Sequence, residues 1–170
     1  SEHDTVAKGI LITTDPALGQ AVLDTISIYL NTLDTAKIAR QSWENYGEII
    51  LAESIDEAAA ISNKLAPEHL EIQTEYAEAL LPQLRNYGSL FIGKHTAEVF
   101  GDYASGTNHT LPTMRAARYT GGVWVGTFLK TCTHQSFSQQ AMQQLAPLVA
   151  RLAHGDGLSA HALAADVRLK

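Results

Sequence analysis

A glutamate and a histidine are adjacent in the segment of residues 66–72, which reads APEHLEI. A histidine can accept the proton of an alcohol near neutral pH, and a neighbouring carboxylate can activate water or hold the imidazole. Glu68 and His69 are therefore candidates for general acid–base chemistry. The alternative is that both residues begin a strand and face solvent, which is the better interpretation of a Glu-His pair without further context.

A carboxylate and an imidazole also occur in residues 101–113, a glycine-hinged stretch with few large apolar side chains. Asp102 is a suitable zinc ligand wherever imidazoles can join it, and the glycines allow the backbone to pack close to a ligand. His109 follows in the same stretch. The alternative is a flexible surface loop that opens with an Asp-Tyr turn.

Two further histidines lie near the ends of the chain. His161 stands on an alanine-rich helix pattern, where a lone histidine is usually a partly buried polar residue. His3 is close to the first residue and fits a frayed terminus as well as a site. Cys132 is the single cysteine, so it has no partner for an internal disulfide and fits a reducing cytoplasm.

The elements that must position these residues follow from hydrophobic spacing and from cap signals. Ser54 and Glu57 form a capping box that begins a helix, and Pro67 stops that helix. A proline at the first position begins an earlier helix at Pro16. The full pattern predicts strands over residues 9–14, 48–52, 69–73 and 89–92, and helices from residue 16 and over 35–45, 54–65 and 75–84. Such alternation is typical of an α/β layer with mainly parallel strands.

The character of the sequence changes after Pro112. Glycines interrupt an apolar stretch near Trp124, a long helix is predicted over residues 135–153 with a kink at Pro147, and a last helix begins near Ser159. We therefore expect an α/β fold in which residues 1–112 form part of a Rossmann-like layered sheet. Residues 113–170 would form a glycine-hinged segment and a helical C-terminal arm that docks on another subunit.

Composition limits the function further. The net charge of −6 argues against binding to nucleic acid or to an anionic membrane surface, since both need a cationic patch. The apolar runs are too short to span a bilayer, and the chain does not open with a signal peptide. These features predict a cytoplasmic globular protein.

The motifs together resemble those of the histidinol dehydrogenase family, zinc enzymes that oxidise an amino alcohol with NAD. The resemblance rests on APEHLEI, on GDYASGTNHTLP over residues 101–112, and on LSAH over residues 158–161. It extends along nearly the whole chain and matches the C-terminal part of the family's chain. Residues that hold NAD are expected upstream of this segment, so we expect no cofactor-binding residues here.

The resemblance also implies a role for each candidate. His69 would take the alcohol proton and Glu68 would activate water, while Asn108 and His109 would order the loop or lie near the substrate. Zinc would be held by a set of three residues, and a glutamine ligand of the family would fall one position before Ser1. These three ligands are His3, Asp102 and His161. L-histidinol would contact the same three residues together with His69 and Asp156.

Asp156 is a departure from the pattern, because the family has a glutamate there and aspartate is one methylene shorter. The resemblance further implies a homodimer whose C-terminal arm completes the neighbour's site. Two alternatives stay open: a non-catalytic fragment or dimerisation module, and a related zinc-dependent dehydrogenase that oxidises another small alcohol.

Overall fold

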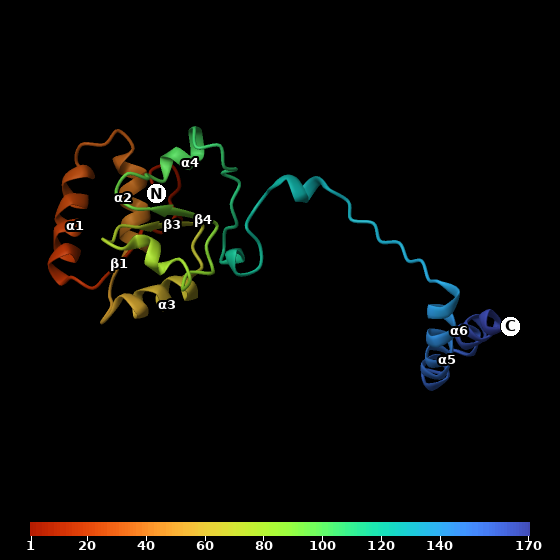
Figure 1. The fold of residues 1–170 in the computed structure, drawn as a ribbon. Helices are drawn as coiled ribbons and strands as arrows, with labels where there is room; N and C mark the ends of the chain where they lie inside the picture. The colour runs from red at the N-terminus through yellow and green to blue at the C-terminus, as the bar shows by residue number, and fades with distance from the viewer. The chain divides into compact units, whose positions relative to one another are not determined.

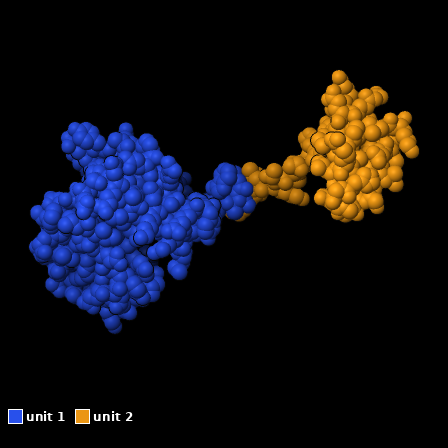
Figure 2. Space-filling model, turned by 90° about the horizontal axis from the view of Figure 1, so that it is seen from below, with its two compact units in different colours: residues 1–127 blue, residues 128–170 orange.

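The computed structural model describes residues 1–170, which fold into two compact units (Figure 2). The first unit is residues 1–127 and contains every strand, while the second is residues 128–170 and contains a pair of helices. The predicted division into residues 1–112 and 113–170 stays a prediction. None of the helices is both long enough and apolar enough to cross a membrane.

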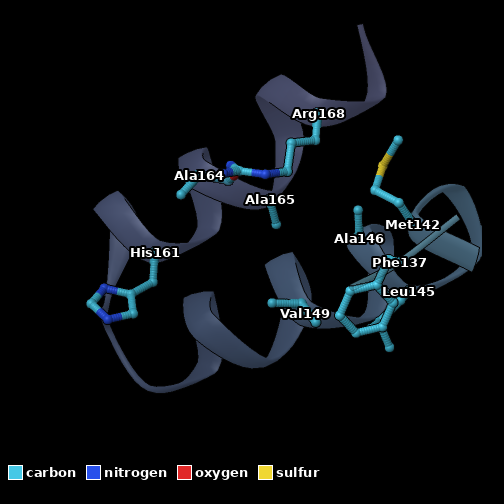
Figure 3. A pocket seen from close by; sticks show the side chains of 9 residues that line it. All are labelled: Phe137, Met142, Leu145, Ala146, Val149, His161, Ala164, Ala165 and Arg168. Atoms are coloured by element: carbon cyan, nitrogen blue, oxygen red, sulfur yellow. The ribbon is translucent and has the colours of Figure 1, made fainter. Parts of the chain in front are cut away.

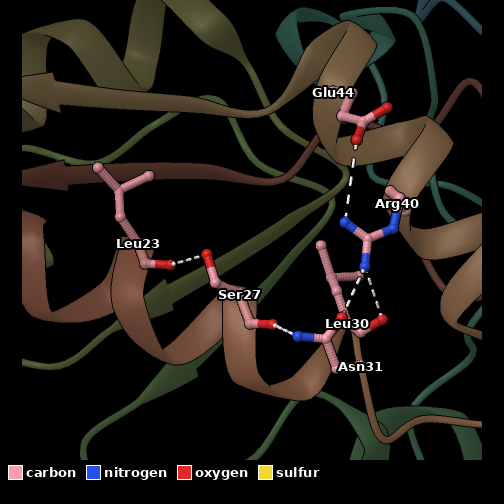
Figure 4. Close-up of polar contacts among 6 residues, drawn as sticks. All are labelled: Leu23, Ser27, Leu30, Asn31, Arg40 and Glu44. Carbon is pink, nitrogen blue, oxygen red and sulfur yellow. Dashed lines mark hydrogen bonds and ion pairs between the residues drawn. The ribbon is translucent and has the colours of Figure 1, made fainter.

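The first strand pair joins β1 (Ile10–Thr13) to β2 (Glu48–Leu51) in parallel. Parallel strands need a crossover, and here it consists of α1 (Pro16–Tyr29) and α2 (Ala36–Tyr46). Arg40 of α2 ties the two helices together, because its guanidinium donates hydrogen bonds to the carbonyl of Leu30 and to the side chain of Asn31 (Figure 4). The crossover is thereby fixed at the end of α1.

The second pair joins β3 (His69–Ile72) to β4 (Ser89–Ile92), again in parallel (Figure 1). It follows α3 (Ile55–Leu65), whose first turn is capped as predicted: the N–H of Glu57 donates to Oγ of Ser54 at 3.1 Å. Beneath this pair lies a core cluster of Ala59, Ile72, Ala77 and Leu84. Apolar burial therefore joins α3 to the strand that begins at His69.

The mixed α/β class is confirmed, and the four strands lie close to their predicted positions. They form two separate two-stranded sheets within these residues, with orders β1-β2 and β3-β4. Short elements complete the first unit: the 3₁₀ helix η1 (Ala77–Leu80), the helix α4 (Val99–Tyr103), and the 3₁₀ helices η2 (Ala116–Arg118) and η3 (Val125–Phe128).

The helix predicted over residues 75–84 is wrong, because only the one-turn η1 forms there. Pro82 has no N–H to donate to a preceding turn. Beyond it, the side chain of Asn63 accepts hydrogen bonds from the N–H groups of Arg85 and Asn86 and donates one to the carbonyl of Gln83. A side chain distant in sequence thus holds the backbone after Pro82 in a path that is not helical.

The second unit is a helix pair, α5 (Gln139–Gly155) and α6 (Ser159–Asp166), followed by the 3₁₀ helix η4 (Val167–Leu169). The helix predicted from residue 135 begins later, because residues 135–138 are not helical. Ser138 instead caps α5: its Oγ accepts a hydrogen bond from the N–H of Ala141 at 3.2 Å. The two helices pack through a cluster of small side chains: Ala146, Ala150, Ala153, Ala162 and Ala165. The larger apolar side chains of α5 are consequently left at its surface, with Leu152 61% exposed.

Candidate functional site

The chain turns sharply between α3 and β3, and this turn places Glu68 and His69. Ala66 ends α3 in the left-handed conformation, with φ of 51° and ψ of 62°, and Pro67 follows it. The carbonyl of Glu68 accepts from the N–H of Ser89 at 2.9 Å, so pairing with the neighbouring strand begins at once. A Cβ on Gly88 would lie 2.5 Å from the Glu68 carbonyl oxygen. Only glycine allows this close approach.

The imidazole of His69 lies beside the ring of Phe91. The register pairs His69 with Ser89 and Glu71 with Phe91, so His69 and Phe91 are diagonal neighbours on one face of the sheet. Their ring centroids are 6.1 Å apart with the planes tilted by 41°. Phe91 is buried, and it therefore gives the more exposed His69 a fixed apolar wall.

Asp102 reaches the same place from α4, which packs against the ring of Phe91. A Cβ on Gly101 would lie 2.9 Å from the Phe91 ring, so glycine lets the helix approach it closely. The prediction of a loop starting at Gly101 is wrong at this point, because residues 99–103 form one helical turn and more. Glu98 directly precedes α4, and a spacing of four residues places it on the same side as Asp102.

Three side chains meet here: His69, Glu98 and Asp102. Nε2 of His69 and Oε1 of Glu98 form an ion-pair contact of 3.2 Å. One possible ligand atom from each residue lies within 4.8 Å of those of the other two. This group is called the β3–α4 cluster below. It brings the predicted proton acceptor together with one predicted zinc ligand.

Burial raises the pKa of Glu98 above its ordinary value. The imidazole of His69 acts in the opposite direction, whereas Asp102 raises this pKa further through its charge and through a hydrogen bond that favours the protonated form.

Glu98 is the residue that sequence reasoning missed. Its spacing from Asp102 is the one available signal, and that spacing becomes informative only once the segment is known to be helical. Glu68, by contrast, is half-buried at the start of β3, and it does not belong to the β3–α4 cluster.

The stretch after α4 is held by Asn108. Its amide donates to the carbonyl of Val123 at 2.8 Å, and its carbonyl oxygen accepts from the N–H of Thr110 at 2.7 Å. The N–H of Val123 also donates to the carbonyl of Thr110. His109 lies between these anchored residues with its side chain exposed, so the backbone around it is ordered while its imidazole stays accessible.

The other predicted zinc ligands are not members of the β3–α4 cluster. His3 is exposed near the start of the chain and does not belong to the cluster. His161 is on α6 in the second unit, at one end of a groove that also includes Met142 and Val149 (Figure 3). Asp156 is the exposed residue that follows α5.

The donor chemistry of the β3–α4 cluster suits a metal ion. Imidazole nitrogen and carboxylate oxygen are both zinc ligands, and catalytic zinc sites use three protein ligands with one open position. Asp102 can therefore serve as a metal ligand where it stands. A histidine within reach of carboxylates, with a metal-binding donor set, is a combination that metal-assisted acid–base chemistry would need.

Comparisons with known proteins give the family. Residues 1–169 match the family described as histidinol dehydrogenase. The chain is 43% identical over 169 residues to the histidinol dehydrogenase of Ruegeria pomeroyi, covering 99% of this chain and 39% of that protein. It is 42% identical over 169 residues to that of Rhizobium meliloti, with the same coverage. The chain belongs to the histidinol dehydrogenase family.

A solved structure agrees with this assignment. The crystal structure of histidinol dehydrogenase from Elizabethkingia anophelis matches with a TM-score of 0.92 and 38% identity. The match covers 99% of this chain and 39% of that one. The chain thus corresponds to a C-terminal portion of the family's polypeptide and spans about 39% of its relatives' length.

Proposed function

We propose that these residues act as the C-terminal part of a histidinol dehydrogenase, which oxidises L-histidinol through the aldehyde to L-histidine in the last steps of histidine biosynthesis. The observation that carries the proposal is the β3–α4 cluster, in which His69 and Asp102 meet inside a chain of this family. The relatives are more than twice as long, so the full-length enzyme means here residues 1–170 together with the upstream part that the relatives have.

His69 takes the proton of the substrate alcohol, and NAD, when bound by the upstream part, would accept the hydride, which gives the aldehyde. Glu68 then removes a proton from water, which adds to the aldehyde carbon. The hydrate loses a proton and a second hydride, which a second NAD would accept, to give the carboxylate. The ordinary pKa of histidine suits the first proton transfer near neutral pH. The role of Glu68 rests on the resemblance of residues 66–72 to the motif of the family.

The proposed function includes a zinc ion whose protein ligands are Asp102, His3 and His161. When bound there, the metal would supply a Lewis acid for the substrate oxygen. NAD contacts belong to the upstream part, which completes the layered Rossmann-like sheet.

The proposed enzyme is a cytoplasmic homodimer whose residues 113–170 form the arm that completes the neighbour's site. Support comes from α5, where Leu145, Leu148 and Leu152 are all more than a third exposed on a helix that packs through alanines. Exposed apolar faces of this kind mark interfaces more often than solvated surfaces. His161 and Asp156 would then act at the site of the partner subunit.

Asp156 supports a second candidate, the oxidation of a different small alcohol. The shorter side chain loses one methylene of reach, and a hydrogen-bonded substrate contact is sensitive to such a change. Comparing kcat/KM for L-histidinol with that for other amino alcohols, in wild-type enzyme and in Asp156→Glu, separates the two candidates.

The direct test measures NADH formation from L-histidinol with purified proteins. The full-length enzyme should turn over, and residues 1–170 alone should not, because the residues expected to hold NAD are upstream. Turnover by the 170-residue chain would contradict the division of the site. A full-length enzyme that is folded and loaded with zinc yet inactive toward L-histidinol would contradict the proposed reaction.

A further inference from the structure

The end of α3 is held by a residue from far along the chain. Lys64 lies in the last turn of this helix, and the guanidinium of Arg118 donates a hydrogen bond to its carbonyl at 2.6 Å, across 54 residues of sequence. The carbonyls of the last turn have no partner within a helix, and a cation is favourable at that end. Arg118 therefore supplies both a donor and a positive charge at the end of α3.

The turn that follows α3 is strained and closely packed. Ala66 is in the left-handed conformation although it has a Cβ, and it is only 2% exposed. Such a conformation persists only where the surrounding structure holds it. On one side, the N–H of Gly88 donates to the carbonyl of Pro67 at 3.0 Å. On the other side, the contact at Lys64 holds the backbone four residues before Glu68.

The segment that carries Arg118 bends sharply before it reaches α3. Met114 and Arg115 are consecutive residues with positive φ, of 53° and 65°, and neither is glycine. Both side chains are exposed, so their own burial does not offset the unfavourable backbone. The bend leads directly into η2, where Ala117 is buried and Arg118 contacts α3. The contacts of η2 are therefore what holds the strained bend in place.

The same segment also packs on the glycine beside Glu68. A Cβ on Gly88 would lie 2.9 Å from Cδ of Pro112 and 3.2 Å from Cβ of Leu111, in addition to its close approach to the Glu68 carbonyl. Pro112 is buried at this contact. Residues 111–118 therefore contact both the residue before β4 and the end of α3.

We propose that Arg118 is a positioning residue for the acid–base pair: through the carbonyl of Lys64 it holds the end of α3, and thereby the turn that presents Glu68 and His69. This role rests on the proposed function of these two residues. The hydrogen bond of Arg118 is to backbone, so it acts through the path of the chain and not on the reacting atoms. Placement of this kind affects the rate, because a displacement of about 1 Å can cost about 10²-fold.

Hydrogen–deuterium exchange of the full-length enzyme tests the contact without needing activity. In Arg118→Ala, the amides of Ala66 and Gly88 should exchange about tenfold faster, because the turn opens more often once the end of α3 is released. Arg118→Lys should stay close to wild type, since the ammonium can still donate to the carbonyl of Lys64. Exchange in α1 should be the same in all three proteins. Wild-type exchange at the turn in Arg118→Ala would overturn the proposal.

The matched control is Arg40→Ala. Arg40 makes the same kind of contact at the other strand pair, where its guanidinium donates to the carbonyl of Leu30 at the end of α1 at 2.9 Å. Loss of either contact should lower the free energy of unfolding, but only Arg118→Ala should lower kcat. Arg115→Ala removes an equal charge from the bend, and it should also leave kcat unchanged.

Steady-state kinetics of the same full-length variants distinguish positioning from general support of the fold. Arg118→Ala should lower kcat for L-histidinol by about ten- to a hundredfold with little change in KM, and Arg118→Lys should recover most of it. An equal fall in kcat in Arg40→Ala would overturn the positioning role, because lost stability would then explain both.

The two measurements separate this proposal from the proposed function. Faster exchange at the turn in Arg118→Ala together with wild-type kcat would refute the positioning role alone. A wild-type enzyme that is inactive toward L-histidinol would refute the proposed function, and the exchange measurement would still decide whether Arg118 holds the turn.

Discussion

In the β1–β2 pair, the polar groups that follow the first strand are used to begin a helix, whereas those around the β3–β4 pair are brought together. Thr13 accepts from the N–H of Asp15 at 3.0 Å, and Asp15 in turn caps α1 by accepting from the N–H of Ala17 at 2.8 Å. Near β3, two carboxyl groups and an imidazole lie close together, and the pKa of Glu98 is raised by burial and by the neighbouring Asp102.

The two pairs share their parallel register and their four-residue strands, so topology does not explain the difference. The difference arises from the glycines and the aromatic ring around β4, which allow α4 and the start of β3 to approach closely. A partly buried carboxyl group that lies beside another has lost favourable contact with water. Such a pair indicates function more strongly than a carboxyl group whose hydrogen bonds cap a helix.

The largest expected effect comes from removing the imidazole of the second pair. His69→Ala in the full-length enzyme should lower kcat for L-histidinol oxidation by about 10²–10⁴-fold, because a positioned general base contributes that much. Steady-state NADH formation measures it. Activity within threefold of wild type would show that the residues around the β3–β4 pair contribute no more to catalysis than those around the β1–β2 pair.

The next effect concerns the close approach that distinguishes the second pair. Gly88→Ala should lower the free energy of unfolding by about 1–3 kcal/mol, because the new Cβ would lie 2.5 Å from a backbone oxygen of Glu68 that cannot move aside freely. Urea denaturation of residues 1–170 measures it. Gly121→Ala is the control, since a Cβ there meets nothing within 4 Å, and it should change stability by less than about 0.5 kcal/mol. Equal stability of the two variants would contradict the packing described.

Removing the cap of the first pair should affect folding and leave catalysis intact. Asp15→Ala should cost about 1 kcal/mol of unfolding free energy, because the N–H of Ala17 loses its acceptor, and Asp15→Asn should cost little. Turnover per folded full-length enzyme should stay at the wild-type value for both. A drop in kcat without a drop in stability would give the first pair a role in the reaction.

The smallest expected effect is a pH-dependent gain in stability from Glu98→Gln. The folded state raises the pKa of Glu98 above 4.5, so this group contributes stability below that pH and loses it as pH rises through the folded pKa. At pH 8 the variant should therefore be slightly more stable, by less than about 1 kcal/mol because the side chain is more than a third exposed. Thermal unfolding should show that the stability gained by Glu98→Gln shrinks as pH falls toward 4.5. A gain in stability that grows on acidification would contradict the raised pKa of Glu98.

Local signals predicted most of the first unit. Ser54 with Glu57, and Asp15 with Pro16, begin helices at the residues where such caps and prolines normally act. The failures came from contacts distant in sequence. The segment after Pro82 is held by Asn63, about twenty residues earlier, and no local pattern contains that information.

The candidate site was predictable only in part, for a similar reason. Motif resemblance pointed to Glu68, His69 and Asp102, and the structure brings His69 and Asp102 together. Glu98 was not predictable, because its place beside His69 depends on how α4 packs against Phe91. The assignment of His3, Asp156 and His161 to the site stays a prediction.

The central claim is that His69 is the base and Asp102 the metal ligand within the β3–α4 cluster, and zinc content tests it most directly. Purified full-length His69→Ala and Asp102→Ala should be compared with wild type by elemental mass spectrometry after equilibration with limiting zinc. We expect His69→Ala to keep the zinc stoichiometry of the wild type and Asp102→Ala to lose it. Parallel loss of zinc in both variants would make His69 a ligand and contradict its role as the proton acceptor.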